Sequence, residues 1–206
     1  MNTRHWFKRL TIVGAFFTFA FFSSQQVSAA QYVFENGQNN SYINAQLISN
    51  PQEYQYVYGY ISPGSDTIDY YVLDFQTFTP QMQVALLKRS LTTDTSFVPM
   101  LVFGDPQQSR FIGQAPFGFP TNLGGRTYAW NNEPEEITDD TMYESLLKGP
   151  AFIRDFSPQR YIVAVHDPTG VGGRYVLYLG AHEPKKTIGN QFQAFLALLR
   201  IKLNLY

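Results

Sequence analysis

The chain has 206 residues, with 15 Lys and Arg against 16 Asp and Glu, a formal net charge of −1. Because no basic face is apparent, nucleic acid and acidic polymers are excluded as expected partners. Cysteine is absent, so we expect neither disulfides nor a lipoprotein anchor, and the domain must be held by its core alone.

The first 29 residues have the organisation of a secretory signal peptide. A basic start precedes the apolar stretch 10–22, which is followed by the small-residue cleavage site Val-Ser-Ala at 27–29. The apolar stretch is shorter than the about 18–20 residues that span a bilayer, which favours cleavage over an uncleaved anchor. Cleavage removes three basic residues and leaves 12 against 16 acidic ones, a net charge of −4. We therefore expect export through the inner membrane of a bacterium, to the periplasm or to an outer-membrane-associated site.

After this segment, period-2 alternation of apolar residues predicts a series of short strands. The polar segment 31–44 is expected to be irregular. The strands are expected at 45–48, 54–61, 69–75, 82–88, 98–103, 160–165 and 174–179. Short strands without a βαβ rhythm favour an all-β fold, an antiparallel sandwich of jelly-roll-like or Greek-key type with a C-terminal α-helix.

Segment 107–150 departs from this pattern, with four prolines and an acidic run at 133–140. We interpret it as a long excursion between strands of one domain, residues 30–183, and expect a short helical or extended piece at 142–148. An unstructured loop of that length is expected to have a role. The acidic run is interpreted as a solvated face of this loop, in preference to a glycosidase pair of carboxylates.

Segment 184–206 is predicted to be a C-terminal helix, because apolar residues recur at helical spacing after residue 188. The residues of this apolar stripe are Phe192, Phe195, Leu196, Leu199 and Leu203. Further apolar residues make the helix apolar nearly all round, so we do not expect it to stay in water. Three placements remain open: against its own domain, on a partner protein, or at a membrane surface.

The sequence offers no catalytic motif. Once the signal peptide is removed only His166 and His182 remain as imidazoles, and turn positions explain both. Neither a Gly-x-Ser-x-Gly nor a His-Glu-x-x-His motif is present, so neither a serine nucleophile elbow nor a zinc site is indicated. We therefore expect no catalytic residue and no enzyme.

Two segments resemble the bacterial pre-peptidase C-terminal domain, a jelly-roll-like β-sandwich often attached to secreted peptidases. Residues 64–71, Gly-Ser-Asp-Thr-Ile-Asp-Tyr-Tyr, resemble its acidic turn with one or two residues inserted, and residues 161–179 resemble its last hairpin. The resemblance covers 31–180 and is specific only at its ends. The middle, and residues 180–183 before the hydrophobic tail, resemble a stand-alone exported branch of the family without a peptidase.

In peptidase-linked members of that family, the acidic turn and an N-terminal Asn/Asp segment bind calcium. By position, the resemblance implies Asn39, Asn40, Asp66 and Asp69 as calcium ligands, with Glu35 nearby. The family's acid is replaced by Asn at position 40 and the turn has a different spacing, so fewer carboxylates are available for the cation. The alternative is that these side chains satisfy the backbone of turns, and no other cofactor is expected.

The excursion and the helix are the two features that a minimal sandwich does not need, and we expect them to make contacts. The expected function is non-catalytic protein–protein assembly in the bacterial cell envelope, with other envelope proteins as partners. One setting is an accessory subunit of a large outer-membrane complex such as a type IV secretion machine. The alternative is a glycan- or peptide-binding module, with or without calcium, that uses the Tyr-rich strand at 54–60; strand propensity also explains those tyrosines.

Overall fold

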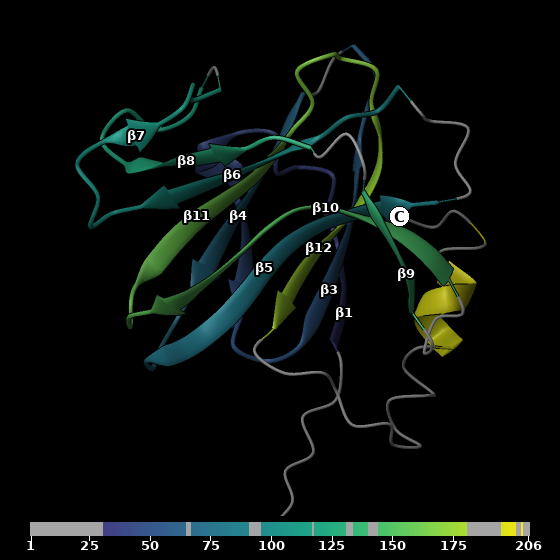
Figure 1. Cartoon of the computed structure of the whole chain (residues 1–206), viewed down its shortest axis with the longest axis horizontal. Helices are drawn as coiled ribbons and strands as arrows, with labels where there is room; N and C mark the ends of the chain where they lie inside the picture. Colours follow the sequence, from purple (N-terminus) through teal and green to yellow (C-terminus); the bar gives the residue numbers. More distant parts are fainter. Residues whose placement is uncertain are drawn as a thin grey trace, which may run out of the picture.

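Two six-stranded sheets pack against each other as a β-sandwich in the computed structural model of the chain (Figure 1). The all-β sandwich with a short C-terminal helix that the sequence predicts is confirmed. The structure describes residues 31–64, 67–90, 96–116, 118–130, 134–139, 144–180, 195–200 and 203. The predicted signal peptide lies outside these residues.

Each sheet combines strands from both halves of the chain. In spatial order, sheet A consists of β1 (Gln31–Phe34), β3 (Gln55–Ile61), β12 (Gly173–Gly180), β5 (Thr79–Arg89), β10 (Glu144–Phe156) and β9 (Glu135–Asp139). Sheet B consists of β2 (Gln46–Ser49), β4 (Ile68–Asp74), β11 (Arg160–His166), β6 (Met100–Asp105), β8 (Gly124–Tyr128) and β7 (Phe111–Ile112). A 3-10 turn, Tyr42–Asn44, precedes β2.

The last two strands of the chain complete both sheets. In sheet A, β12 lies between β3 and β5, and in sheet B, β11 lies between β4 and β6. These pairs are antiparallel, whereas the edge pairs β1–β3, β2–β4 and β7–β8 are parallel. Strands that are distant in sequence therefore have to meet, as in Greek-key and jelly-roll connections.

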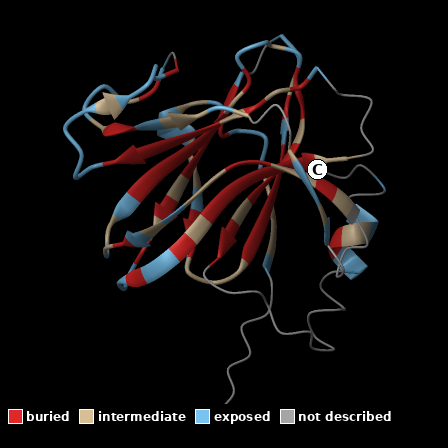
Figure 2. Ribbon diagram, in the orientation of Figure 1, coloured by how far each residue is buried: buried red, intermediate tan, exposed pale blue. Residues whose placement is uncertain are grey.

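The core between the sheets is apolar and rich in aromatic rings. Phe75 and Phe156 stack with their centroids 4.5 Å apart, and Tyr161 meets both rings edge-on. All three are almost completely removed from solvent. Figure 2 shows buried residues along most strands of both sheets. Each fully buried aromatic side chain contributes about 2–3 kcal/mol to stability, so this core can hold the domain without disulfides.

Sheet B is covered on its outer face by the chain between β6 and β8. Phe119 from this connection is buried and lies on Tyr70, with ring centroids 6.3 Å apart. Gly104 in β6 leaves room for the Phe119 ring, because a Cβ there would lie 2.8 Å from it. Part of the predicted excursion therefore packs on its own domain.

The structure differs from the sequence prediction in two places. Segment 107–150 contains β7, β8, β9 and the start of β10, whereas an excursion between strands was expected. Residues 31–34, expected to be irregular, form the edge strand β1. The acidic run contributes β9, which is paired with β10 alone. Acidic residues are disfavoured in strands, and local pattern therefore gave little sign of β9; charged edge strands are common because they resist further pairing.

Candidate functional site

The C-terminal helix, residues 195–200, lies on the outer face of sheet A. Ala197 belongs to a buried cluster with Tyr58 and Val176 of that sheet, and Leu198 packs against the cluster. The guanidinium carbon of Arg200 lies 4.1 Å from the centroid of the Phe34 ring in β1. The sequence leaves three placements of the helix open. In the structure, this side of the helix packs on its own domain.

The other side of the helix is apolar and exposed (Figure 2). The predicted interface residues on this side and in the following turn are Phe195, Leu196, Leu199 and Leu203, with exposed fractions of 53, 44, 41 and 63%. Phe192, the fifth predicted residue, lies outside the described residues. Within the described part of the chain, no helix combines the length and the apolar character needed to cross a membrane.

A hydrogen-bonded group of polar side chains lies inside the sandwich where the resemblance implies calcium. The Tyr175 hydroxyl donates to Asp69 Oδ2 at 2.7 Å and is 2.6 Å from the Tyr71 hydroxyl. The same Tyr175 oxygen is 3.4 Å from Glu35 Oε2, and Glu35 Oε1 accepts the main-chain N–H of Tyr60 at 2.7 Å. Two carboxylates therefore share one tyrosine hydroxyl.

Both tyrosines of this group stay protonated over the physiological range. Burial raises the pKa of Tyr71 well above its ordinary value of 10.0, and the negative charges of Asp69 and Glu35 add to the rise. Burial raises the pKa of Tyr175 in the same way, followed by the effects of Tyr71 and of the same two carboxylates. Tyr175 can therefore donate its proton to Asp69, which is 1% exposed, and this bond offsets the cost of burying the carboxylate.

The predicted calcium ligands are only partly brought together. Asn39 is buried and its main-chain oxygen accepts the Tyr70 N–H at 2.8 Å, whereas Asn40 is exposed. Asp66 lies outside the described residues. Among the residues that are described, no group of three His, Cys, Asp or Glu side chains could hold a metal ion. Calcium takes six to eight oxygen ligands; of the predicted ligands, Asp69 accepts the Tyr175 hydroxyl proton, and the calcium site stays a prediction.

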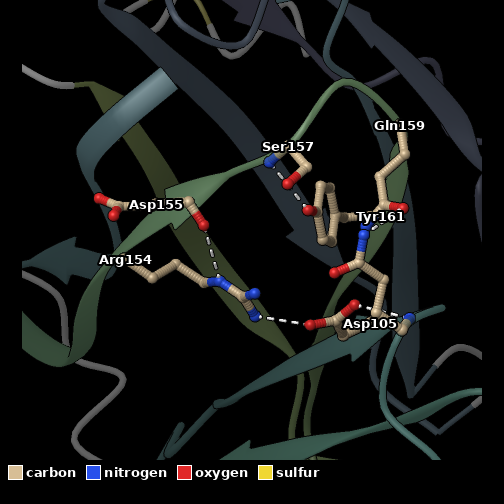
Figure 3. A network of polar contacts seen from close by, with 7 residues as sticks. Asp105, Arg154, Asp155, Ser157, Gln159 and Tyr161 are labelled. Carbon is tan, nitrogen blue, oxygen red and sulfur yellow. Dashed lines mark hydrogen bonds and ion pairs between the residues drawn. The ribbon is translucent and has the colours of Figure 1, made fainter. Parts of the chain in front are cut away.

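A second polar network ties the two sheets together at one end of the sandwich (Figure 3). Arg154 of β10 donates through Nη1 to Asp105 Oδ2 of β6 at 2.9 Å, and the Asp105 side chain is almost fully buried. The Arg154 guanidinium also lies over the rings of Phe103 and Tyr161, 4.9 and 5.5 Å from their centroids. This pair links the sheets, and local sequence gives no sign of it.

The histidine that the structure describes, His166, is the last residue of β11 and lies directly before a turn. His166 Nδ1 is 2.9 Å from a main-chain oxygen, and the neighbouring Asp167 organises the β11–β12 turn. Its carboxylate accepts N–H and O–H bonds from Thr169 at 3.0 and 2.6 Å and the N–H of Gly172 at 2.7 Å. Burial opposes ionisation of Asp167, but these hydrogen bonds outweigh it and hold its pKa below 3.8. His182 lies outside the described residues.

A groove lies on the outer face of sheet A. It has a volume of about 410 Å³, within the range of small-ligand sites. Alternate residues of neighbouring strands line it, because successive side chains of a strand point to opposite faces. The lining includes Tyr54, Tyr56, Tyr178, Gln81, Gln83, Ala85, Lys148 and Gly180. Gln81 and Gln83 were missed from sequence, although their alternation with buried apolar residues in β5 was a usable signal.

Comparisons with known proteins find similarity among solved structures alone. No protein-family model matches the chain, and no curated protein does. Among solved structures, the pre-peptidase C-terminal domain of a collagenase from Bacillus anthracis matches with a TM-score of 0.37 and 15% sequence identity. The match covers 66% of this chain and 93% of that domain.

Proposed function

We propose that the protein is a non-catalytic, exported β-sandwich that assembles with other proteins of the bacterial cell envelope. The observation that carries this proposal is the exposed apolar side of the C-terminal helix, formed by Phe195, Leu196, Leu199 and Leu203. Apolar surface in water costs about 25 cal/mol per Å² relative to burial. Contiguous exposed apolar residues on a folded domain are a common mark of a contact surface.

The packing of the helix supports a protein partner. Its inner side is fixed by Ala197 and Leu198, so the outer side is presented on the firm support of sheet A. An apolar helical face of this kind is suited to a groove on another protein. A complementary partner would bury Phe195 and Leu199 without displacing the helix from its own domain.

Segment 107–150 is proposed as a second contact region. Ile112 in β7, at the edge of sheet B, is 56% exposed. Phe119 from the same segment is buried on its own sheet, so the contact would involve other parts of the segment, such as the β7 edge. The setting that we propose is an accessory subunit of a large outer-membrane complex, such as a type IV secretion machine.

The test has to separate partner binding from folding. Deleting the whole helix would uncover the apolar cluster beneath Ala197, so substitutions on the outer side are preferable. We expect a Phe195→Ser/Leu199→Ser double variant to keep its melting temperature and to lose cross-linked envelope partners in the native bacterium. Ile43→Ser is the matched control, because this residue is 91% exposed and lies in the 3-10 turn.

Two outcomes would contradict the proposal. If the double variant retains the same cross-linked partners as the wild type and the Ile43→Ser control, the helix is not the contact surface. If its melting temperature falls by several degrees, Phe195 and Leu199 belong to the core of the domain. Mass spectrometry of the cross-linked complexes identifies the partners, and calorimetry measures the melting temperature.

A further inference from the structure

The groove on the outer face of sheet A combines curvature with a chemically mixed lining. Its floor is formed by β12 and β5. One side is formed by Tyr54, just before β3, and by Tyr56 in β3. The opposite side is formed by β9 and β10. The register between β10 and β5 shifts between Lys148 and Ala151. A β-bulge of this kind bends a sheet, which places β9 and the start of β10 as a wall beside the floor.

One side of the groove is aromatic. The rings of Tyr54 and Tyr178 meet edge to face with centroids 5.0 Å apart, and Tyr54 meets Tyr56 in the same way at 5.3 Å. Gly180 makes this arrangement possible, because a Cβ there would lie 2.9 Å from the Tyr54 ring. Tyrosines offer an apolar ring and a polar hydroxyl together, which matches ligands that have apolar faces and polar rims.

The opposite end of the floor carries neutral amides. Gln81 has a φ of 48°, a backbone conformation that is unfavourable for residues other than glycine and is common at functional sites. The exposed Asp155 carboxylate holds it there, accepting the Gln81 main-chain N–H at 2.9 Å and its side-chain N–H at 3.0 Å. Gln83, two residues further along β5, lines the same face.

The charge of the lining argues for an uncharged ligand. Lys148 is the one charged residue among the groove-lining residues described, and its Nζ lies 3.4 Å from the Glu135 carboxylate. A peptide that binds by strand addition needs an unpaired sheet edge. The floor of this groove is a sheet face, where β12 and β5 are already paired with strands on both sides, so only side chains can contact a ligand.

We propose that this groove binds an uncharged oligosaccharide. The faces of its sugar rings would lie against the half-buried Tyr54 and Tyr178, which pack on the buried ring of Tyr56, and its hydroxyl groups would exchange hydrogen bonds with Gln81 and Gln83. This site is separate from the outward side of the C-terminal helix. It would attach the domain to a glycan surface independently of any protein partner.

The test uses the full protein and four uncharged hexasaccharides, built from β-1,4-glucose, α-1,4-glucose, β-1,4-N-acetylglucosamine and β-1,4-mannose. We expect calorimetric titration to show at least one of them binding with a dissociation constant of about 1 mM or tighter. Tyr178→Ala and Gln83→Leu should each weaken that binding about tenfold, equivalent to about 1.4 kcal/mol. Tyr60→Ala is the matched control and should leave the affinity unchanged, since Tyr60 is on β3 but does not line the groove.

Amide NMR spectra show whether each variant is folded and which main-chain groups respond to the sugar. If Tyr178→Ala does not fold, two other measurements test the site. They are the affinity of Gln83→Leu for the sugar and the shifts of the Ala85 and Gly180 amide signals when the sugar is added to the wild type. Binding by none of the four sugars overturns the proposal. So does binding that is insensitive to Gln83→Leu, or tighter binding of a hexagalacturonate or a six-residue peptide than of every uncharged sugar.

Discussion

Removing the Tyr175 hydroxyl by Tyr175→Phe is the most direct test of the polar group in the core. The substitution keeps the ring and deletes one oxygen. That oxygen donates to Asp69 at 2.7 Å and lies 2.6 Å from the Tyr71 hydroxyl, and all three side chains are at most 1% exposed. Water therefore cannot replace it without a local rearrangement.

The magnitude follows from these two bonds. A hydrogen bond to a charged group contributes about 1.5–3 kcal/mol and one between neutral groups about 1 kcal/mol, so we expect a loss of about 3 kcal/mol. For a domain of this size, that corresponds to a fall in melting temperature of about 6–12 °C. Calorimetry and urea unfolding measure it. Tyr60→Phe removes the same oxygen from a partly exposed side chain and should change the melting temperature by less than about 2 °C.

A double variant tests the geometry as well as the energy. Because Tyr71 and Tyr175 share one bond, Tyr71→Phe/Tyr175→Phe should cost less than the sum of the two single changes, by about 1 kcal/mol. If Tyr175→Phe melts at the same temperature as Tyr60→Phe, the prediction is wrong. The buried carboxylate of Asp69 would then not depend on the Tyr175 hydroxyl. If the losses of stability of the two single variants add up to that of the double variant, the Tyr71–Tyr175 hydrogen bond does not contribute to stability.

Four further predictions concern other parts of the domain. Arg154→Met leaves the buried Asp105 carboxylate without its cation and should cost about 3 kcal/mol in urea unfolding; an unchanged midpoint would show that the pair is dispensable. Because the folded pKa of Asp167 lies below 3.8, this carboxylate stabilises the fold above that pH and the contribution is lost as the pH falls toward the folded pKa. Asp167→Asn should therefore reduce the loss of stability between neutral and acidic pH, and an equally steep acid transition would contradict this. Gly59→Ala places a Cβ 2.3 Å from the Tyr175 ring and should destabilise the domain by about 3 kcal/mol, whereas a soluble variant of wild-type stability would show that the ring can move. Adding about 5 mM calcium should shift the melting temperature by less than about 2 °C, and a larger, chelator-sensitive shift would establish a calcium site.

Several elements were visible in the sequence because their signal is local. The alternation at 54–61, 160–165 and 174–179 predicted β3, β11 and β12 to within one or two residues. Period-2 patterning is a property of each strand by itself. Gly59 carried an unused signal of the same kind, since a glycine inside a strand often marks a close approach of another group.

Other elements depend on partners that local sequence does not identify. β9, whose acidic residues favour strands weakly, is a strand because β10 pairs with it. β1 is a different case: Tyr32, Val33 and Phe34 favour strands, and the prediction missed β1 because these residues were included in the polar segment 31–44. The amides of Gln81 and Gln83 likewise became part of a groove only when β9 and the bulged β10 formed its wall.

The candidate sites show the same division. From sequence, Asp69 was grouped with Asn39, Asn40 and Asp66 as a calcium ligand, because the family resemblance implies these positions. In the folded chain its partner is Tyr175, 106 residues away, and a hydroxyl proton takes part in satisfying the carboxylate.

The sequence by itself determined the fold class, the positions of the main strands and the apolar character of the tail, since all three follow from the order of apolar and polar residues along short segments. Only the tertiary structure decided which acids are buried, which side of the tail helix remains exposed and where a groove forms. Those outcomes depend on contacts between strands that are distant in the chain, and the free energy of each contact becomes available only when both sheets are assembled.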